Sequence, residues 1–339
     1  MKFNKEGKVI AGSFLVLLLV FLASLFIGRY RINPINLYTA IKALLLGNGE
    51  FQPGSDWSVF YFIRLPRLLL VAAVGSVLSL TGATYQSIFR NPLVSPSILG
   101  VSAGAGFGVA LGILVTSGSL TPVYILAFLF GIISVLLAYA ISVFGKGNNI
   151  MMLVLSGILV TSLFNAMISI LKYLADPYEK LPGIVFWLMG GFNRTGWQEV
   201  RFALPLMLPG IVVILLLRWY LNVMSMGEEE AISLGVNARL LRGGLIVVST
   251  FMIAAAVATT GQVTWIGLVV PHIARFLVGA NHRYMLIVAA VTGASLLMIM
   301  DDLARTLTTA EIPISIITAF IGAPFFAYLL LSKNESGWS

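Results

Sequence analysis

Three consecutive carboxylates, Glu228 to Glu230, stand directly after a glycine in an otherwise apolar second half of this sequence. Acidic side chains are favoured in the first turn of a helix, where they meet the positive end of the helix dipole, and a following glycine is a common helix stop. We therefore expect a short helix in the polar loop at about 221–242. Its expected residues are Gly227, Glu228, Glu229, Glu230, Ala231, Leu234 and Gly235. Such a helix is best explained as a docking surface for a second protein, and a solvated charged loop is the alternative.

Residue patterns typical of catalysis are missing from the sequence. No GxxxxGK[ST] phosphate-binding loop occurs, and the nearest fragment is Gly145-Lys146-Gly147. The two histidines, His272 and His282, are ten positions apart with no carboxylate between them, which is poor spacing for a metal site or an acid–base pair. There is no cysteine. We expect no catalytic residue, no metal site and no cofactor in this chain, and we interpret His272 as a packing histidine that makes a hydrogen bond.

A few ionisable residues lie within apolar sequence. Asp301, Asp302 and Glu311 fall near the end of an expected span, and Asp301 and Arg305 are four positions apart, where they can pair on one helix face. An ion-coupled secondary transporter is expected to carry ionisable groups nearer the middle of its spans. An ion-coupled secondary transporter is therefore the alternative function, and a transporter driven by a separate ATPase is the favoured one.

The amino-acid composition indicates the class of protein to which this chain belongs. Hydrophobic residues make up 59% and charged residues 10% of the 339 positions, whereas soluble domains carry about 25% charged residues. Several apolar runs reach the ~20 residues that a helix needs to cross a bilayer. The net charge of +8 is spread between apolar segments, which does not indicate a nucleic-acid surface. The sequence predicts an all-α polytopic membrane protein in contact with lipid.

The apolar segments predict ten transmembrane helices in a single domain over residues 1–339. They lie at about 9–27, 64–89, from 100 through 112, 122–144, 150–172, 202–220, 243–260, 263–279, 285–306 and 313–332. The third contains Gly100, Gly104, Gly108 and Gly112, which recur every four positions and predict a face that another helix can approach closely. The long connection at about 173–201 has room for a short interfacial helix.

The predicted topology places both termini in the cytoplasm. Ten spans return the chain to the side on which it started, and Lys2, Lys5 and Lys8 flank the first span, which usually dominates orientation. The count of basic residues, eleven inside against ten outside, barely favours this choice. With this orientation the loop at 221–242 is cytoplasmic and the loop at 173–201 is on the outer side.

A set of motifs in a fixed order resembles the permease subunits of type II ABC importers, the FecCD/BtuC-like family for iron–siderophore, haem or cobalamin uptake. The resemblance covers about residues 60 to 332. The motifs are Arg64-Leu-Pro-Arg67, Gly82-Ala-Thr-Tyr-Gln86, Asn91-Pro-Leu93, Ser95-Pro96, Leu99-Gly-Val-Ser-Ala-Gly-Ala105, Trp187-Leu-Met-Gly-Gly191, Leu221-Asn222, Gly227-Glu-Glu229, Gly267-Leu-Val-Val-Pro-His-Ile-Ala-Arg275, Asp302-Leu-Ala-Arg305, Glu311-Ile-Pro313 and Gly322-Ala-Pro-Phe-Phe326. Ser315 departs from the pattern at a position where the family usually has glycine.

The resemblance implies a BtuC-like permease fold and a transport subunit that is not itself an enzyme. It implies a second permease copy or paralogue, two cytoplasmic ATPase subunits that bind ATP and magnesium, and an extracytoplasmic substrate-binding protein. It places the chain in the bacterial or archaeal cytoplasmic membrane. It also assigns Arg64 and Arg305, at the outer surface by the span count, to docking of the binding protein.

The cytoplasmic gate is predicted at two places. Asn91, Pro92 and Leu93 end the second span, and Pro92 disfavours helical geometry at Asn91, so that Leu93 can be held at an apolar constriction. Asn149, Ile150 and Met151 occupy a loop where the resemblance implies a second part of the gate, and they replace the small hydroxyl residues expected there.

Overall fold

The computed structural model describes residues 5–46, 54–116, 119–145 and 150–332. All regular elements in these ranges are helices, which agrees with the expected all-α class. Seven helices are long and apolar enough to cross a membrane, and three shorter apolar helices accompany them, which gives the predicted total of ten. The long ones are α1 (Lys5–Phe26), α4 (Leu65–Ile88), α6 (Leu120–Phe144), α7 (Ile150–Leu174), α9 (Trp197–Leu216), α12 (Ala238–Thr260) and α14 (His282–Thr306), and the short ones are α5 (Val101–Val115), α13 (Ile266–Val278) and α15 (Ile314–Ser332).

Smaller helices lie at the two ends of the bundle. At one end are α2 (Pro34–Leu46) and α3 (Ser55–Ser58), and α3 runs through a π-helical segment, η1 (Val59–Arg64), into α4. At the opposite end are α10 (Arg218–Met226) and α11 (Glu228–Ser233). The loop between α7 and α9 contains α8 (Lys180–Leu188), the short helix expected there. Following the predicted topology, we refer to the end with α11 as the inner end and to the end with α2 and α3 as the outer end.

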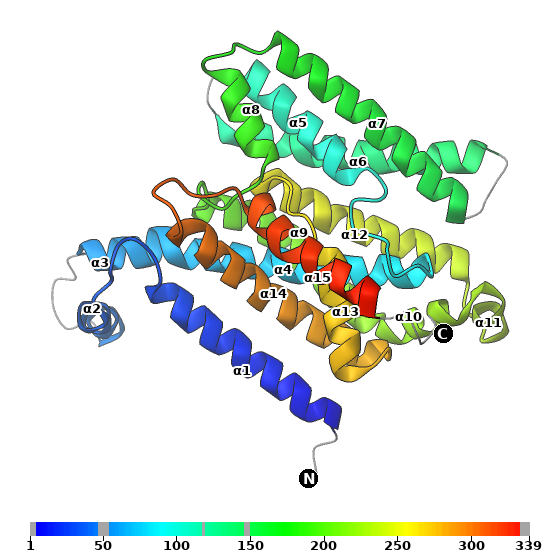
Figure 1. Ribbon diagram of the computed structural model, residues 1–339, viewed down its shortest axis with the longest axis horizontal. Coiled ribbons are helices and arrows are strands. Elements are labelled where there is room, and N and C mark those ends of the chain that lie inside the picture. The colour runs from blue at the N-terminus through cyan, green and yellow to red at the C-terminus, as the bar shows by residue number, and fades with distance from the viewer. Residues whose placement is uncertain (1–4, 47–53, 117–118, 146–149, 333–339) are drawn as a thin grey trace.

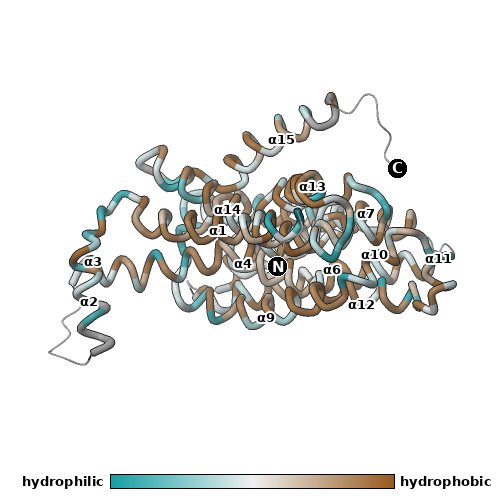
Figure 2. Tube along the Cα trace, turned by 90° about the horizontal axis from the view of Figure 1, so that it is seen from below, coloured by the Kyte–Doolittle hydropathy of each residue, from teal (hydrophilic) through white to brown (hydrophobic). Residues whose placement is uncertain are grey.

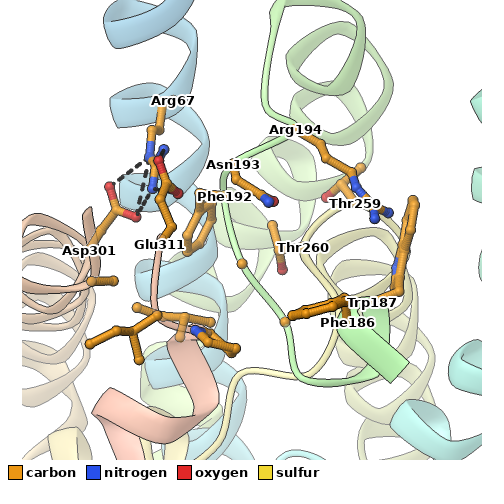
Figure 3. A pocket seen from close by; sticks show the side chains of 16 residues that line it. Arg67, Phe186, Trp187, Phe192, Asn193, Arg194, Thr259, Thr260, Asp301 and Glu311 are labelled. Carbon is orange, nitrogen blue, oxygen red and sulfur yellow. Dashed lines mark hydrogen bonds and ion pairs between the residues drawn. The ribbon is translucent and has the colours of Figure 1, made fainter. Parts of the chain in front are cut away.

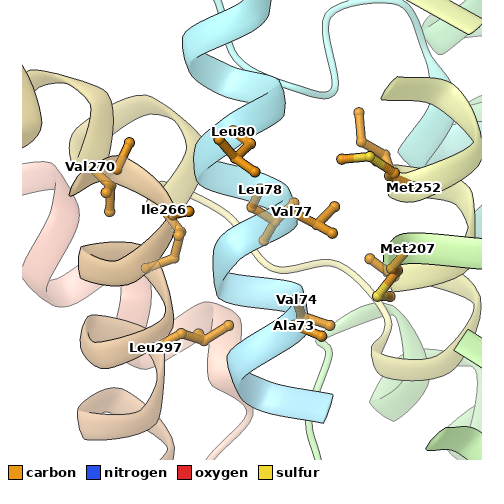
Figure 4. Close-up of a cluster of buried hydrophobic side chains, with 14 of the residues drawn as sticks. Ala73, Val74, Val77, Leu78, Leu80, Met207, Met252, Ile266, Val270 and Leu297 are labelled. Atoms are coloured by element: carbon orange, nitrogen blue, oxygen red, sulfur yellow. The ribbon is translucent and has the colours of Figure 1, made fainter. Parts of the chain in front are cut away.

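Helix α4 is the centre of the larger bundle. In the most apolar stretch of the α3–α4 span, 83% of the residues are buried, whereas in that of α1 only 11% are buried. Figure 4 shows its aliphatic side chains between Ile266, Val270 and Leu297 on one side and Met207 and Met252 on the other. These neighbours come from α13, α14, α9 and α12, so four spans pack around one.

Glycines allow two of these neighbours to approach closely. A Cβ atom added at Gly75 would lie 2.4 Å from the carbonyl oxygen of Gly293 in α14, and one at Gly82 would lie 1.8 Å from that of Gly267 in α13. Any side chain at either position would clash with backbone. Close contact of this kind supports helix association in lipid, where apolar surface alone gives little driving force.

A smaller bundle is formed by α5, α6, α7 and α8 (Figure 1). Added Cβ atoms at Gly104, Gly108 and Gly112 would meet α6 at 2.3, 2.3 and 2.9 Å, which confirms the predicted packing face. Gly100 has a different role, because it lies before α5 with a φ of 87°.

Three expected boundaries were wrong. Helix α9 begins at Trp197 and not near 202, because the Glu199 side chain accepts a hydrogen bond from the Gly196 amide (2.8 Å) and caps an earlier turn. The same span ends at Leu216, and residues 218–226 form the separate helix α10. Helix α12 begins at Ala238, where the Asn237 side chain accepts from the Leu240 amide (3.0 Å). Local capping, which hydropathy does not report, sets these starts.

Helix α15 projects from the rest of the molecule (Figure 2). Gly322 anchors it, since an added Cβ atom would lie 2.5 Å from the Trp265 side chain. Phe320, Tyr328 and Leu331 are 67–78% exposed, as expected of side chains that face lipid or another membrane subunit.

Candidate functional site

The predicted acidic helix is present as α11. Gly227 precedes it with a φ of 145°, a value that favours glycine, and Gly235 ends it with a φ of 75°. The Gly235 amide donates to Ile232 (2.9 Å) and the Val236 amide donates to Ala231 (2.9 Å), which is the hydrogen-bond pattern of a Schellman stop. The sequence therefore predicted both ends of α11 correctly, although the helix is only six residues long.

Helix α11 has an anchored face and an open face. Ala231 is fully buried in a small apolar cluster with Val223, Met224, Val236 and Ala238. Glu228, Glu229 and Glu230 are exposed, and Ile232 and Leu234 are 63% and 54% exposed. A surface that combines carboxylates with exposed aliphatic side chains on a fixed backbone is suited to a protein partner.

Side-chain contacts join α11 and the preceding helix α10 to neighbouring spans. The Glu228 carboxylate pairs with Arg242 of α12 at 2.8 Å. In α10, the Asn222 Oδ1 accepts from the His282 amide (2.8 Å) and lies 2.8 Å from His282 Nδ1. His282 Nε2 hydrogen-bonds the Ser87 hydroxyl in α4. These contacts connect α11 to α12 and α10 to α14, and His282 connects α14 to α4.

The sequence analysis included Asn222 in the motif Leu221-Asn222 but gave it no role, because its partner His282 is 60 positions away. His282 is 5% exposed and has polar partners at both ring nitrogens, which makes it a connecting residue between helices. His272 behaves as predicted, because its Nε2 lies 3.1 Å from the Pro92 carbonyl oxygen in the neighbouring segment.

The inner turn at residues 91–93 has the expected geometry. The Leu93 amide donates to the Asn91 side chain (2.9 Å), and the Leu93 side chain is 52% exposed. Met151, at the start of α7, is 72% exposed, and Ile150 is partly buried. Asn149 lies outside the described residues. The segment after this turn packs closely on α7, because a Cβ atom added at Gly157 would lie 2.2 Å from the Ile98 carbonyl oxygen. The gate at Leu93 and Met151 stays a prediction.

A cluster of buried charges lies at the outer end. Arg67 of α4 donates to both Asp301 of α14 (2.8 and 2.9 Å) and Glu311 (2.9 Å), so one guanidinium joins two carboxylates from different segments (Figure 3). Arg67 is 6% and Asp301 1% exposed. The sequence analysis missed this pairing, because the partners are more than 230 positions apart.

The expectation that Arg64 and Arg305 lie exposed at the outer surface was wrong. Arg64 is 3% exposed and donates to the carbonyl oxygens of Leu25 and Tyr30. Arg305 is 6% exposed and binds Asp302, while its distance to Asp301 is 3.9 Å. Packing of α1 and α4 against α14 covers both arginines, and Arg67 takes the carboxylate of Asp301. The predicted pairing of Arg305 is therefore shifted from Asp301 to Asp302.

A cavity of about 50 Å³ lies beside this cluster, between Arg67 and the loop after α8. On its far side Arg194 stacks over the Trp187 ring at 4.7 Å (Figure 3). The loop is tied down by backbone hydrogen bonds from Gly191 to Thr260 (2.8 Å) and from Ile314 to Gly190 (3.0 Å). The two carboxylates that border the cavity, Asp301 and Glu311, both accept hydrogen bonds from Arg67.

This bundle of apolar helices, with an anchored acidic helix at one end, is that of a multi-pass membrane permease. The profile of the FecCD transport family matches residues 16–332. The chain therefore belongs to the FecCD transport family, and it is the permease component of an ABC importer.

Individual relatives agree over most of the chain. The molybdate import system permease protein MolB of Haemophilus influenzae is 40% identical and covers 99% of both chains. The hemin transport system permease protein HmuU of Yersinia pestis is 39% identical over 82% of this chain and 85% of its own. A solved metal-chelate type ABC transporter in an inward-facing conformation superposes with a TM-score of 0.86 at 39% identity, covering 96% and 99% of the two chains.

Proposed function

We propose that this chain is the membrane pathway of an ATP-driven importer that carries an iron–siderophore or a related metal chelate, such as haem or cobalamin, into the cytoplasm. The observation that carries the proposal is α11, an exposed acidic helix that is anchored by Ala231 and bound to α12 through Glu228. The preceding helix α10 is bound to α14 through Asn222 and His282. A partner that moves α11 moves the spans with it. The metal-containing cargoes in the names of the relatives support the class of substrate.

The proposed importer contains further subunits beside this chain. Its sequence has no phosphate-binding loop, so ATP and magnesium belong on two cytoplasmic ATPase subunits that dock on α11. The exposed side of α15 suits a second permease copy or paralogue. The outer end receives a substrate-binding protein. The chain then resides in a bacterial or archaeal cytoplasmic membrane with both termini inside.

The second candidate, an ion-coupled secondary transporter, is less well supported by the charges. Asp301 is fixed by Arg67, and Asp302 is fixed by Arg305 and Ser24. A carboxylate that carries protons or ions has to be released in some step of the cycle, whereas these carboxylates are held by several hydrogen bonds each.

Uptake by proteoliposomes that contain the permease, its ATPase and its binding protein distinguishes the two. The proposal predicts that uptake requires ATP, stops with vanadate and survives collapse of the ion gradients. Uptake that continues with vanadate but stops when the gradients collapse would establish the secondary transporter instead.

The gate is tested by a single cysteine, which is unique because the chain has none of its own. We expect Leu93→Cys to crosslink between the two permease copies in one nucleotide state only, since Leu93 lies exposed on a fixed turn. Met226→Cys, on an exposed side chain at the same end, is the control for general accessibility. Equal labelling of position 93 and no crosslink in every nucleotide state would remove it from the gate.

A further inference from the structure

A groove runs between α6 and α12 on the side of the molecule away from α1. It encloses about 260 Å³, far more than the ~10–15 Å³ that one water requires. Its lining is aliphatic and aromatic, and the Thr250 hydroxyl donates back to Ile246 (2.7 Å), so it offers the groove no free donor. The lining residues are Ile132, Val135, Leu136, Tyr139, Gly243, Ile246, Val247, Thr250 and Phe251. Such a groove is suited to a hydrocarbon chain.

The groove continues toward the inner end into a smaller polar hollow. Tyr139, Gly243 and Ile246 line both, and the hollow adds Arg239 and Arg242 from the first turns of α12. Tyrosine is enriched at the level where hydrocarbon meets headgroups. The order along the groove is therefore apolar channel, tyrosine and then two arginines, which is the order of acyl chain, interface and phosphate in a phospholipid.

The arginines are available to an anion. Arg239 is exposed, and no acidic partner for it occurs among the described residues. Arg242 is 13% exposed and binds Glu228 through one terminal nitrogen, but its buried Nε finds no hydrogen-bond partner in the described ranges. A buried guanidinium N–H without an acceptor is costly, and a phosphate oxygen is the acceptor that an arginine fork fits best.

We propose that this groove binds one anionic phospholipid, with an acyl chain between α6 and α12 and its phosphate at Arg239 and Arg242. Basic pockets between transmembrane helices are a known setting for anionic headgroups. Because Arg242 also holds Glu228, the bound phosphate lies next to the first residue of α11. The site does not depend on which substrate the permease carries.

Two adjacent glycines provide the test. An added Cβ atom at Gly243 or at Gly244 meets nothing within 4 Å, so both positions accept a side chain, but only Gly243 lines the groove. We expect the purified chain, mixed with phosphatidylglycerol or phosphatidylcholine, to retain phosphatidylglycerol in native mass spectrometry. Gly243→Leu should lose this lipid, and Gly244→Leu should keep it. Equal retention by both variants, or no preference for phosphatidylglycerol in the parent, would overturn the proposal.

The headgroup end is tested separately. One basic residue near an anionic lipid surface contributes about 5-fold in binding, so Arg239→Gln should weaken phosphatidylglycerol about 5-fold. It should weaken phosphatidylcholine less, because the choline ammonium offsets the charge of its phosphate. An equal loss of both lipids would show a structural effect and contradict the assignment. A crosslink between two copies that carry Leu136→Cys would assign the groove to a permease interface instead, because Leu136 lies within it and is 58% exposed.

Discussion

The two ends of this permease use charged residues in opposite ways. At the outer end Arg67, Arg305, Asp301 and Asp302 are at most 8% exposed and bind one another. At the inner end the three glutamates of α11 are exposed, and Glu228 is the one with an ion pair among the described residues. Charges of the first kind hold helices together, whereas charges of the second kind are available to a partner. Position in the sequence does not distinguish them, but burial does.

The largest effect is expected from breaking the outer cluster. Arg67→Met leaves Asp301 buried without its partner, and removing one member of a buried ion pair costs about 3–5 kcal/mol. We expect a lower midpoint of thermal unfolding in detergent. Arg194→Met is the control, because the exposed Arg194 loses only a cation–π contact of about 0.5–1 kcal/mol. Equal midpoints for the two variants would refute a structural role for the cluster.

The next effect separates stability from docking at Arg305. Arg305→Gln removes charged hydrogen bonds to Asp302, worth about 1.5–3 kcal/mol each, and we expect it to lower the unfolding midpoint. Association of the binding protein, followed against salt concentration, should change little in the molecules that remain folded. A fully stable variant with slowed association would restore the docking role for this residue.

A smaller effect is expected where the inner end connects to the spans. Asn222→Ala leaves the His282 amide and Nδ1 without their acceptor, which costs about 1–3 kcal/mol. Asn222→Asp keeps that oxygen, loses only the exposed hydrogen bond from Asn222 Nδ2 to Asn281 Oδ1 (3.0 Å), and is the control. We expect the alanine variant to hydrolyse ATP with less uptake per ATP, while the aspartate variant stays close to the parent. Equal uptake per ATP in both would exclude the Asn222 contact from coupling.

The sequence was sufficient for two features that depend on neighbouring residues. Gly227, the three glutamates and Gly235 predicted α11, and the glycines of α5 predicted its contact face, because capping and four-residue spacing are local. The environment of Arg64 and Arg305 could not be predicted in this way. It is created by α1 and α4 packing on α14. The sequence around an arginine near a span end does not show whether the folded protein buries or exposes that arginine.

The family motifs had the same limit. They placed Arg67 and Asp302 in the correct spans. They did not show that Arg67 forms ion pairs with Asp301 and Glu311. Among three carboxylates near one span end, the choice of partner depends on how far α4 is rotated against α14. That rotation is set by contacts such as Gly75 against Gly293, which bring together two helices that are far apart in the sequence.

The central claim, that α11 is the surface through which an ATPase drives transport, is tested most directly by reversing its charge. The double variant Glu228→Lys with Glu229→Lys costs about 0.3–1 kcal/mol per site in helix stability, and the exposed Glu228 pair with Arg242 adds at most about 1 kcal/mol. Glu179→Lys, another exposed glutamate outside α11, is the matched control. The measurement is ATP-dependent uptake by the reconstituted importer at unchanged permease content. We predict loss of uptake and of permease-stimulated ATP hydrolysis in the double variant and parental values in the control. Parental uptake and hydrolysis in the double variant would contradict the account.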